Sequence, residues 1–143
     1  MVKLYEYYTE RYPGRLKDCE LLYSVRDLRN ATAHSNCLIN KLQKGNNKPS
    51  VKIVKFISNI DGIGESMRRN KLSNKFLCDF VTLLYVYEEF IYSDVMKERR
   101  FQQLQEFVDG RAVKNKIFFT KNESIKTAYF FAQKVVDYMN HSC

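Results

Sequence analysis

Hydrophobic positions along this chain recur at intervals of three and four residues, the spacing that puts side chains on one face of an α-helix. The strongest such segment is Ser73 to Tyr92, whose broad apolar face predicts a central, mostly buried helix. Its apolar positions are Phe76, Leu77, Phe80, Leu83, Leu84, Tyr87, Phe90 and Ile91. Asp94 to Val108 has a narrower apolar face, so we predict an amphipathic helix there with Gly110 capping its end.

The N-terminal part predicts two helices separated by Pro13-Gly14. The first runs from Val2 to Tyr12, and the second leads from Arg15 into the segment Arg29–His34. Helical propensity continues as far as Leu42. A bend or helix start at Asn30, within Arg29–His34, stays open, because asparagine competes for backbone hydrogen bonds and favours helix starts.

The remaining segments complete an all-α pattern. Gly45–Ser50 is the clearest loop, Val51 to about Asn59 predicts a helix, and Asp61–Gly64 predicts a turn that a short helical turn follows. Thr120–Glu123 fits a capping box, so we expect the last helix to begin there. Its core positions are Ile125, Ala128, Tyr129, Ala132, Val135, Val136 and Met139. We therefore predict one domain over residues 1–143, a bundle of five to six helices.

Composition agrees with helices and adds a hint about partners. Only 5 Gly and 2 Pro occur in 143 residues, so few positions break a helix. The 24 Lys and Arg against 16 Asp and Glu give a net charge of +8. A basic surface attracts polyanions, of which nucleic acid is the commonest, although many basic proteins bind no nucleic acid.

Cysteine and hydropathy patterns argue against other classes of protein. Cys19, Cys37, Cys78 and Cys143 form no C-x-x-C pair, and with only two histidines the chain predicts neither a zinc site nor another cofactor. The N-terminus lacks the uninterrupted apolar stretch of a signal peptide. No apolar run approaches the roughly 18 residues of a membrane span. We therefore expect a cytoplasmic protein with reduced thiols.

The candidate chemistry lies in Arg29-Asn30-Ala31-Thr32-Ala33-His34. Asn30 and His34 are one helical turn apart on the same face, whereas Arg29 is rotated by about 140° from His34 on a regular helix. Histidine exchanges protons near neutral pH, arginine holds phosphate with fixed donors, and asparagine can orient the histidine or donate to a phosphate oxygen. These types suit RNA cleavage, in which the 2′-hydroxyl is the nucleophile and no metal is needed. A histidine on a helix also commonly has a purely structural role.

Two basic clusters, Lys97–Arg100 and Met67–Lys71, are further candidates. Within the second, Arg68 and Arg69 are candidate contacts to RNA phosphates. A solvated helix face, which needs no ligand, is the more common explanation of such clusters.

Around Arg29 the sequence resembles a known family. Arg29-Asn30 followed by His34 is similar to the R-x4-H motif of HEPN domains, and more closely to their Abi (abortive infection) branch. In that branch an RN..AH segment is followed by a hydrophobic pair and an asparagine. The matching positions are Arg29, Asn30, Ala33, His34, Leu38 and Asn40. The firm match covers about a dozen residues.

The resemblance implies a HEPN-like helical bundle that dimerises and cleaves RNA. It assigns catalysis to Arg29, Asn30 and His34 and a supporting, substrate-binding place to Asn40. It also implies a role as a toxin or antiviral effector, with a protein antitoxin as an expected partner. Abi proteins of this branch are usually longer than this chain, and the tyrosine of HEPN toxins controlled by a nucleotidyltransferase is absent after His34. The alternatives are a non-catalytic module that binds RNA, nucleotide or protein, and a purely structural domain.

Overall fold

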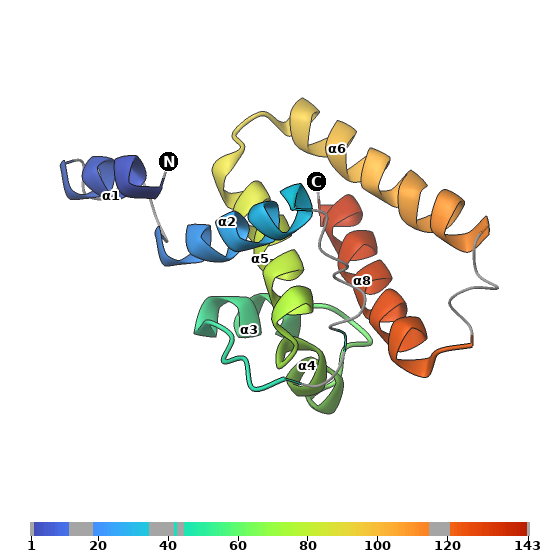
Figure 1. The fold of residues 1–143 in the computed structure, drawn as a ribbon. Helices are drawn as coiled ribbons and strands as arrows, with labels where there is room; N and C mark the ends of the chain where they lie inside the picture. The colour runs from blue at the N-terminus through green and yellow to red at the C-terminus, as the bar shows by residue number, and fades with distance from the viewer. Residues whose placement is uncertain (1, 12–18, 35–41, 43–44, 115–120, 143) are drawn as a thin grey trace.

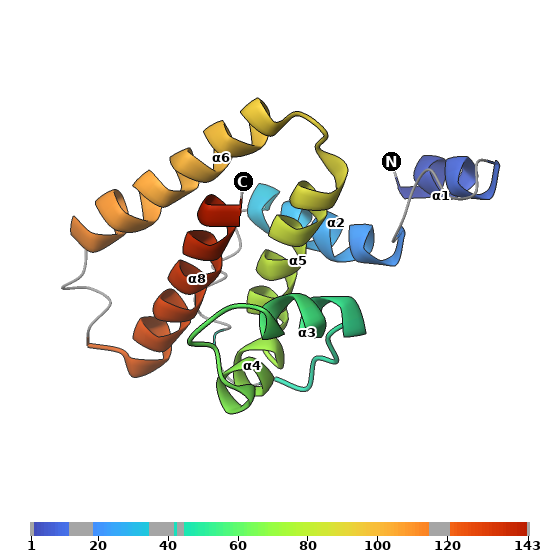
Figure 2. The same ribbon diagram turned by 180° about the vertical axis from the view of Figure 1, so that it is seen from behind.

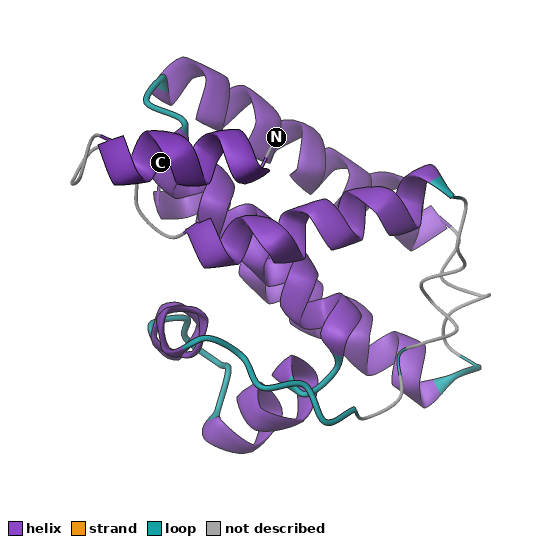
Figure 3. Cartoon of the chain, turned by 60° about the vertical axis from the view of Figure 1, so that its left-hand side comes forward, coloured by secondary structure: helices purple, strands orange, loops and turns teal. Residues whose placement is uncertain are grey.

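The computed structural model of the chain describes residues 2–11, 19–34, 42, 45–114 and 121–142, in which every regular element is a helix (Figures 1 and 3). The all-α prediction is therefore confirmed. The elements are α1 (Val2–Arg11), α2 (Cys19–Ala33), α3 (Val51–Ser58), α4 (Glu65–Leu72), α5 (Lys75–Phe90), α6 (Asp94–Glu106), the π-helix η2 (Phe107–Ala112) and α8 (Glu123–Ser142).

Helix α5 is the centre of the bundle and contacts α2, α3, α4 and α8. Its place at the centre agrees with the prediction for Ser73–Tyr92, but the buried face differs from the predicted one. Of the predicted apolar positions only Leu77 and Leu84 are buried and the rest are half-buried, whereas the other buried residues are Cys78, Asp79, Val81, Thr82 and Val86. Its N-cap is Asn74, a buried residue whose Oδ1 accepts from the backbone N–H of Leu77 at 3.0 Å. The capping bond satisfies a backbone donor that the first helical turn leaves unpaired.

Helices α6 and α8 lie alongside each other (Figures 1 and 2). Gln105 Nε2 of α6 donates to Asp137 Oδ1 of α8 at 2.6 Å, and the Tyr129 hydroxyl of α8 donates to the carbonyl of Val108, in η2 directly after α6, at 2.8 Å. The expected cap at Gly110 is wrong, because the chain passes through Gly110 in the π-helix η2. A glycine that ends a helix commonly adopts a positive φ, and Gly110 does not. Among the described glycines, a positive φ is found at Gly62, where it is 77°.

The predicted start of the last helix needs a similar correction. Helix α8 begins at Glu123, and its cap is Asn122, whose Oδ1 accepts from the backbone N–H groups of Ser124 and Ile125 at 3.0 and 3.2 Å. Thr120, the predicted capping residue, lies outside the described residues. Asparagine caps a helix as well as threonine does, so two overlapping start signals competed in the sequence.

Helices α3 and α4 pack together at one end of the molecule (Figures 1 and 2). The predicted loop from Gly45 to Ser50 leads into α3, and Asn47 fastens this loop by donating to the carbonyls of Ser73 and Leu72 at 3.1 and 3.0 Å. A Cβ at Gly45 would lie 2.7 Å from the Ser73 carbonyl oxygen, so the close approach requires glycine. Helix α4 has eight residues, more than the short helical turn that was predicted.

Candidate functional site

Helix α2 carries the Arg29–His34 segment, and its inner face is held against α5. Leu21 and Leu28 are buried on that face, while Arg29 is exposed. A polar bridge adds to the packing: Lys75 Nζ of α5 lies 2.9 Å from Asp79 Oδ2, also on α5, and 3.7 Å from Asp27 Oδ2 of α2. The apolar contacts and this bridge together set which side of α2 faces outward.

The helix runs without interruption through Asn30 to Ala33. It therefore neither starts nor bends at Asn30 in the way that was left open. The backbone N–H of His34 donates to the Asn30 carbonyl at 3.0 Å and closes the last turn, and Thr32 Oγ1 donates to the Arg29 carbonyl at 2.8 Å. His34 thus stands in the turn where the helix ends.

The side chains of Arg29 and Asn30 are joined to each other. Arg29 Nη1 donates to Asn30 Oδ1 at 3.1 Å, which draws the guanidinium round the helix toward the face shared by Asn30 and His34. Arg29 and His34 are exposed, and Asn30 is half-buried. Within the described residues neither Arg29 nor His34 forms an ion pair. An exposed guanidinium without a carboxylate partner is suited to bind a phosphate group.

A second arginine on α2, Arg26, has a different environment. Its Nη2 lies 2.9 Å from Asp27 Oδ1, and its guanidinium lies over the ring of Tyr23, 4.9 Å from the ring centroid. The hydrogen bond from Arg26 lowers the pKa of Asp27, against the opposing effect of burial. Sequence reasoning did not single out this group, although Tyr23 and Arg26 are at a spacing that brings side chains together on a helix.

Tyr23 also connects this face of α2 to α1, because its hydroxyl donates to Glu6 Oε1. Helix α1 lies at the edge of the molecule, beside the N-terminal half of α2 (Figures 1 and 2). The outward face of α2 is therefore covered in part near Tyr23 and exposed at Arg29 and His34.

The other candidate residues do not join Arg29 and His34. Arg68 and Arg69 belong to α4, at the end of the molecule opposite the C-terminal end of α2 (Figures 1 and 2). Arg69 Nη2 lies 3.0 Å from Glu65 Oε1, and both side chains are largely exposed. Asn40 lies outside the described residues. One chain therefore cannot bring Arg29 and Arg69 to the same phosphate group.

Over the described ranges, no group of three or more His, Cys, Asp and Glu side chains is arranged to hold a metal ion. In the same part of the chain, each helix is too short or too polar to traverse a lipid bilayer.

Comparisons with known proteins found no match: no family model fits the sequence, and no curated protein or solved structure is similar to the chain. We therefore infer a function from the residues of this chain alone.

Proposed function

We propose that the chain is a metal-independent endoribonuclease of the HEPN type. The observation that carries the proposal is the group formed by Arg29, Asn30 and His34 at the exposed C-terminal end of α2. There the Arg29 guanidinium is oriented by Asn30 at 3.1 Å, and the His34 backbone closes the turn onto Asn30. The exposure of Arg29 and His34 favours contact with a ligand over a structural role inside one chain.

The chemistry begins at the RNA 2′-hydroxyl. His34 accepts the proton of this hydroxyl, and the oxygen attacks the adjacent phosphorus to give a pentacoordinate phosphate. Arg29 stabilises the extra negative charge that develops on the phosphate oxygens. The bond to the 5′-oxygen breaks, and this oxygen takes a proton. The products carry a 2′,3′-cyclic phosphate, or a 3′-phosphate after hydrolysis, and a 5′-hydroxyl.

Two proton transfers are needed, and the site supplies one histidine per chain. His141, the second histidine, is on α8 near the C-terminus and is not joined to the Arg29 group. We therefore propose that the active form is a homodimer in which two copies of Arg29 and His34 share one cleft. One His34 acts as the base, and its mate or a water molecule protonates the leaving oxygen.

The cellular role that fits this activity is that of a toxin or an abortive-infection effector. A nuclease without a metal requirement is active as soon as it folds and dimerises, so a protein antitoxin that covers the Arg29–His34 end of α2 is a fitting partner. RNA is the substrate in this role.

The test is cleavage of RNA in the presence of EDTA by the wild type and by the His34→Ala and Arg29→Ala variants. We expect both variants to lose activity by about 10²-fold or more, the usual loss when a proton-transfer or charge-stabilising group is removed. Arg26→Ala is the matched control, because it removes an exposed arginine of the same helix that is already paired with Asp27. Circular dichroism verifies that each variant is folded.

The alternative is a non-catalytic module that binds RNA, nucleotide or a protein partner. Wild type that binds RNA but does not cleave it would favour this alternative. Growth inhibition that persists unchanged in His34→Ala cells would do the same, since inhibition would then not depend on the histidine.

A further inference from the structure

The positive charge of the chain is concentrated in one short segment. Residues 45–75 contain seven lysines and arginines against Asp61 and Glu65, so this segment carries +5 of the net +8. Residues 76–143 contain nine basic and nine acidic residues and contribute no net charge. The charge thus belongs to the α3–α4 end of the molecule and not to the long helices α6 and α8.

Two of these seven basic residues are directed at neighbouring helices. Lys71 Nζ donates to Thr127 Oγ1 of α8 at 2.6 Å, and burial lowers the pKa of Lys71 although Glu123 opposes the shift. Lys75 bridges Asp79 and Asp27. The other five form what we call the α3–α4 basic surface: Lys48, Lys52, Lys55, Arg68 and Arg69.

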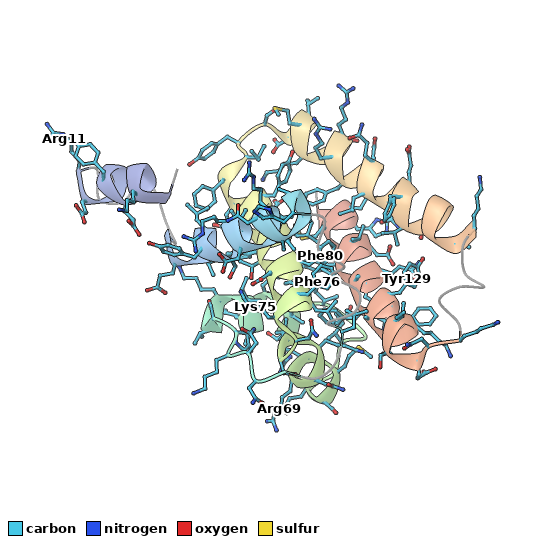
Figure 4. All side chains as sticks on the ribbon, viewed as in Figure 1. Arg11, Arg69, Lys75, Phe76, Phe80 and Tyr129 are labelled. Carbon is cyan, nitrogen blue, oxygen red and sulfur yellow. The ribbon has the colours of Figure 1, made fainter. Side chains whose placement is uncertain are left out.

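The members of this surface are accessible to solvent. Lys48, Lys52, Lys55 and Arg69 are exposed, and Arg68 is half-exposed. Arg69 points away from the body of the molecule in Figure 4. Lys48, Lys55 and Arg68 form no ion pair with any described residue, and the pair of Arg69 with Glu65 is a solvent-exposed one that contributes little energy.

The kind of partner follows from what the surface lacks. Most large apolar side chains of α3 and α4 face the core: Ile53 and Ile57 are 0% exposed and Leu72 is 1% exposed. The exposed ones are Val51 and Met67, one on each helix, and a single apolar side chain is not the continuous apolar face with which a helix enters a lipid layer. No aromatic side chain of residues 45–75 is exposed either, since Phe56, the only aromatic there, packs against Tyr85 and Tyr138 at 5.5 and 5.9 Å. Residues 45–75 thus offer no exposed aromatic ring on which a nucleic-acid base could stack.

We propose that the α3–α4 basic surface binds the sugar–phosphate backbone of RNA without reading its sequence. Lysine and arginine without aromatic neighbours contact phosphates, which position a nucleic acid but do not specify its bases. Because this surface is distant from Arg29 and His34, one RNA strand contacts the two at separate places along its length. The inference gives the proposed nuclease its substrate contact, but the binding itself does not depend on cleavage.

The test is binding of a 2′-O-methyl RNA hairpin, which keeps the phosphates but lacks the nucleophile of cleavage. Fluorescence anisotropy compares the wild type with the triple variant Lys48→Gln/Lys52→Gln/Lys55→Gln. We call it the α3 triple variant, because Lys52 and Lys55 belong to α3 and Lys48 to the loop that leads into it. The matched control is Arg99→Gln/Arg100→Gln/Lys114→Gln, which removes three exposed basic charges from the part of the chain without net charge. Both triple variants have the same net charge, so a difference between them reports where the RNA lies.

We expect the α3 triple variant to bind at least tenfold more weakly and the control to bind nearly as the wild type does. The slope of log affinity against log salt falls by roughly two to three units in the α3 triple variant, because three phosphate contacts are lost. Arg68→Gln/Arg69→Gln, an independent variant of α4, weakens binding as well. The substituted side chains are exposed or half-exposed, and thermal melting verifies their folding.

Equal weakening in the two triple variants, or none in either, overturns the inference. Binding to vesicles of phosphatidylserine without binding to RNA overturns it too and assigns the surface to a membrane. The inference and the proposed function fail separately. If the α3 triple variant alone loses hairpin binding but the wild type does not cleave ordinary RNA, only the proposed nuclease activity is contradicted. If the wild type cleaves RNA but both triple variants bind the hairpin equally, only the proposed binding surface is contradicted.

Discussion

At the scale of single residues, the hydrogen bond between Arg29 and Asn30 makes Asn30 a positioning residue for the arginine. We expect Asn30→Ala to lower the rate of RNA cleavage at saturating substrate about tenfold, because one hydrogen bond of about 1–1.5 kcal/mol then no longer orients the guanidinium. The same substitution in an Arg29→Ala background changes the rate little, since the residue that Asn30 orients is gone. Single-turnover cleavage measures both effects.

Thr32→Ala is the control for this prediction, because Thr32 bonds only to the Arg29 backbone at this end of the described helix. A loss in Asn30→Ala as large as that in His34→Ala contradicts the positioning role and gives Asn30 a direct contact with the reacting phosphate. The positioning role is also contradicted if Arg29→Ala/Asn30→Ala loses as much activity as the two single substitutions together.

The sequence predicted part of this arrangement and not the rest. Helical spacing placed Asn30 and His34 on one face, since backbone geometry alone decides that. It left open whether Asn30 orients His34 or donates to a phosphate oxygen, and whether the backbone bends near Asn30, and it did not foresee a bond from Arg29 to Asn30. A side-chain partner depends on rotamers and neighbours, so the Arg29–Asn30 bond and the pairing of Arg26 with Asp27 emerged only in three dimensions.

The bridge between Lys75 and Asp79 gives a second prediction at this scale. Asp79 is buried, so Lys75→Met leaves a buried carboxylate without its cation. We expect the free energy of unfolding to fall by about 1–2 kcal/mol. The loss is no larger because the Lys75 side chain is exposed and water screens its charge. Converting Asp79 to Asn in the same chain restores part of this loss. Urea unfolding measures the three proteins.

The difference in free energy of unfolding between the wild type and Lys75→Met depends on pH. Burial acts to lower the pKa of Lys75, but its hydrogen bond with Asp79 and the charges of Asp79 and Asp27 outweigh burial and raise that pKa above the ordinary 10.5. A raised pKa stabilises the fold fully below the pKa of the unfolded chain and ceases to do so as the pH rises through the folded value. The gap between wild type and Lys75→Met is therefore constant near neutral pH and narrows above about 10.5. A gap that widens there contradicts the bridge.

At the scale of elements, the two asparagine caps offer a matched pair. Asn74→Ala removes a buried acceptor at the start of the central helix α5, and Asn122→Ala removes an exposed one at the start of α8. We expect losses of about 2 kcal/mol and about 1 kcal/mol, because only at Asn74 is the orphaned backbone donor cut off from water. Chemical denaturation measures both, and an aspartate at either position, which keeps the acceptor, restores stability. A larger loss at Asn122 contradicts this order.

The elements that were predicted well are those whose apolar positions repeat over several turns, above all α5 and α8. Helix α4 was underestimated because only Leu72 of its eight residues is buried, so the pattern offered little periodicity. Gly110 was given a capping role from its place after a periodic segment. The π-helix absorbs that position instead, and nothing in a periodicity of 3.6 residues signals such a change of winding.

At the scale of the whole molecule, the all-helical architecture followed from composition and periodicity, whereas the distribution of charge over it required the fold. Arg68 and Arg69 were predicted as substrate contacts beside a catalytic Arg29, but the bundle holds α4 apart from the C-terminal end of α2 (Figures 1 and 2). The packing of α3 against α4 decides instead which basic residues share a surface with Arg68 and Arg69. They are Lys52 and Lys55 of α3, together with Lys48 of the preceding loop.

The proposed homodimer leads to the last prediction. Arg29→Ala and His34→Ala are each inactive as pure proteins, but their mixed dimer retains one Arg29 and one His34 in the shared cleft. We expect mixing the two variants to restore a measurable fraction of RNA cleavage, because base and charge-stabilising group then come from different chains. The mixture is tested after subunit exchange, and each variant at the same total concentration is the control. No recovery, with mixed dimers verified by differently tagged chains, contradicts a cleft in which one Arg29 and one His34 from different chains suffice. It leaves a cleft that needs both copies of His34, or one that belongs to the monomer.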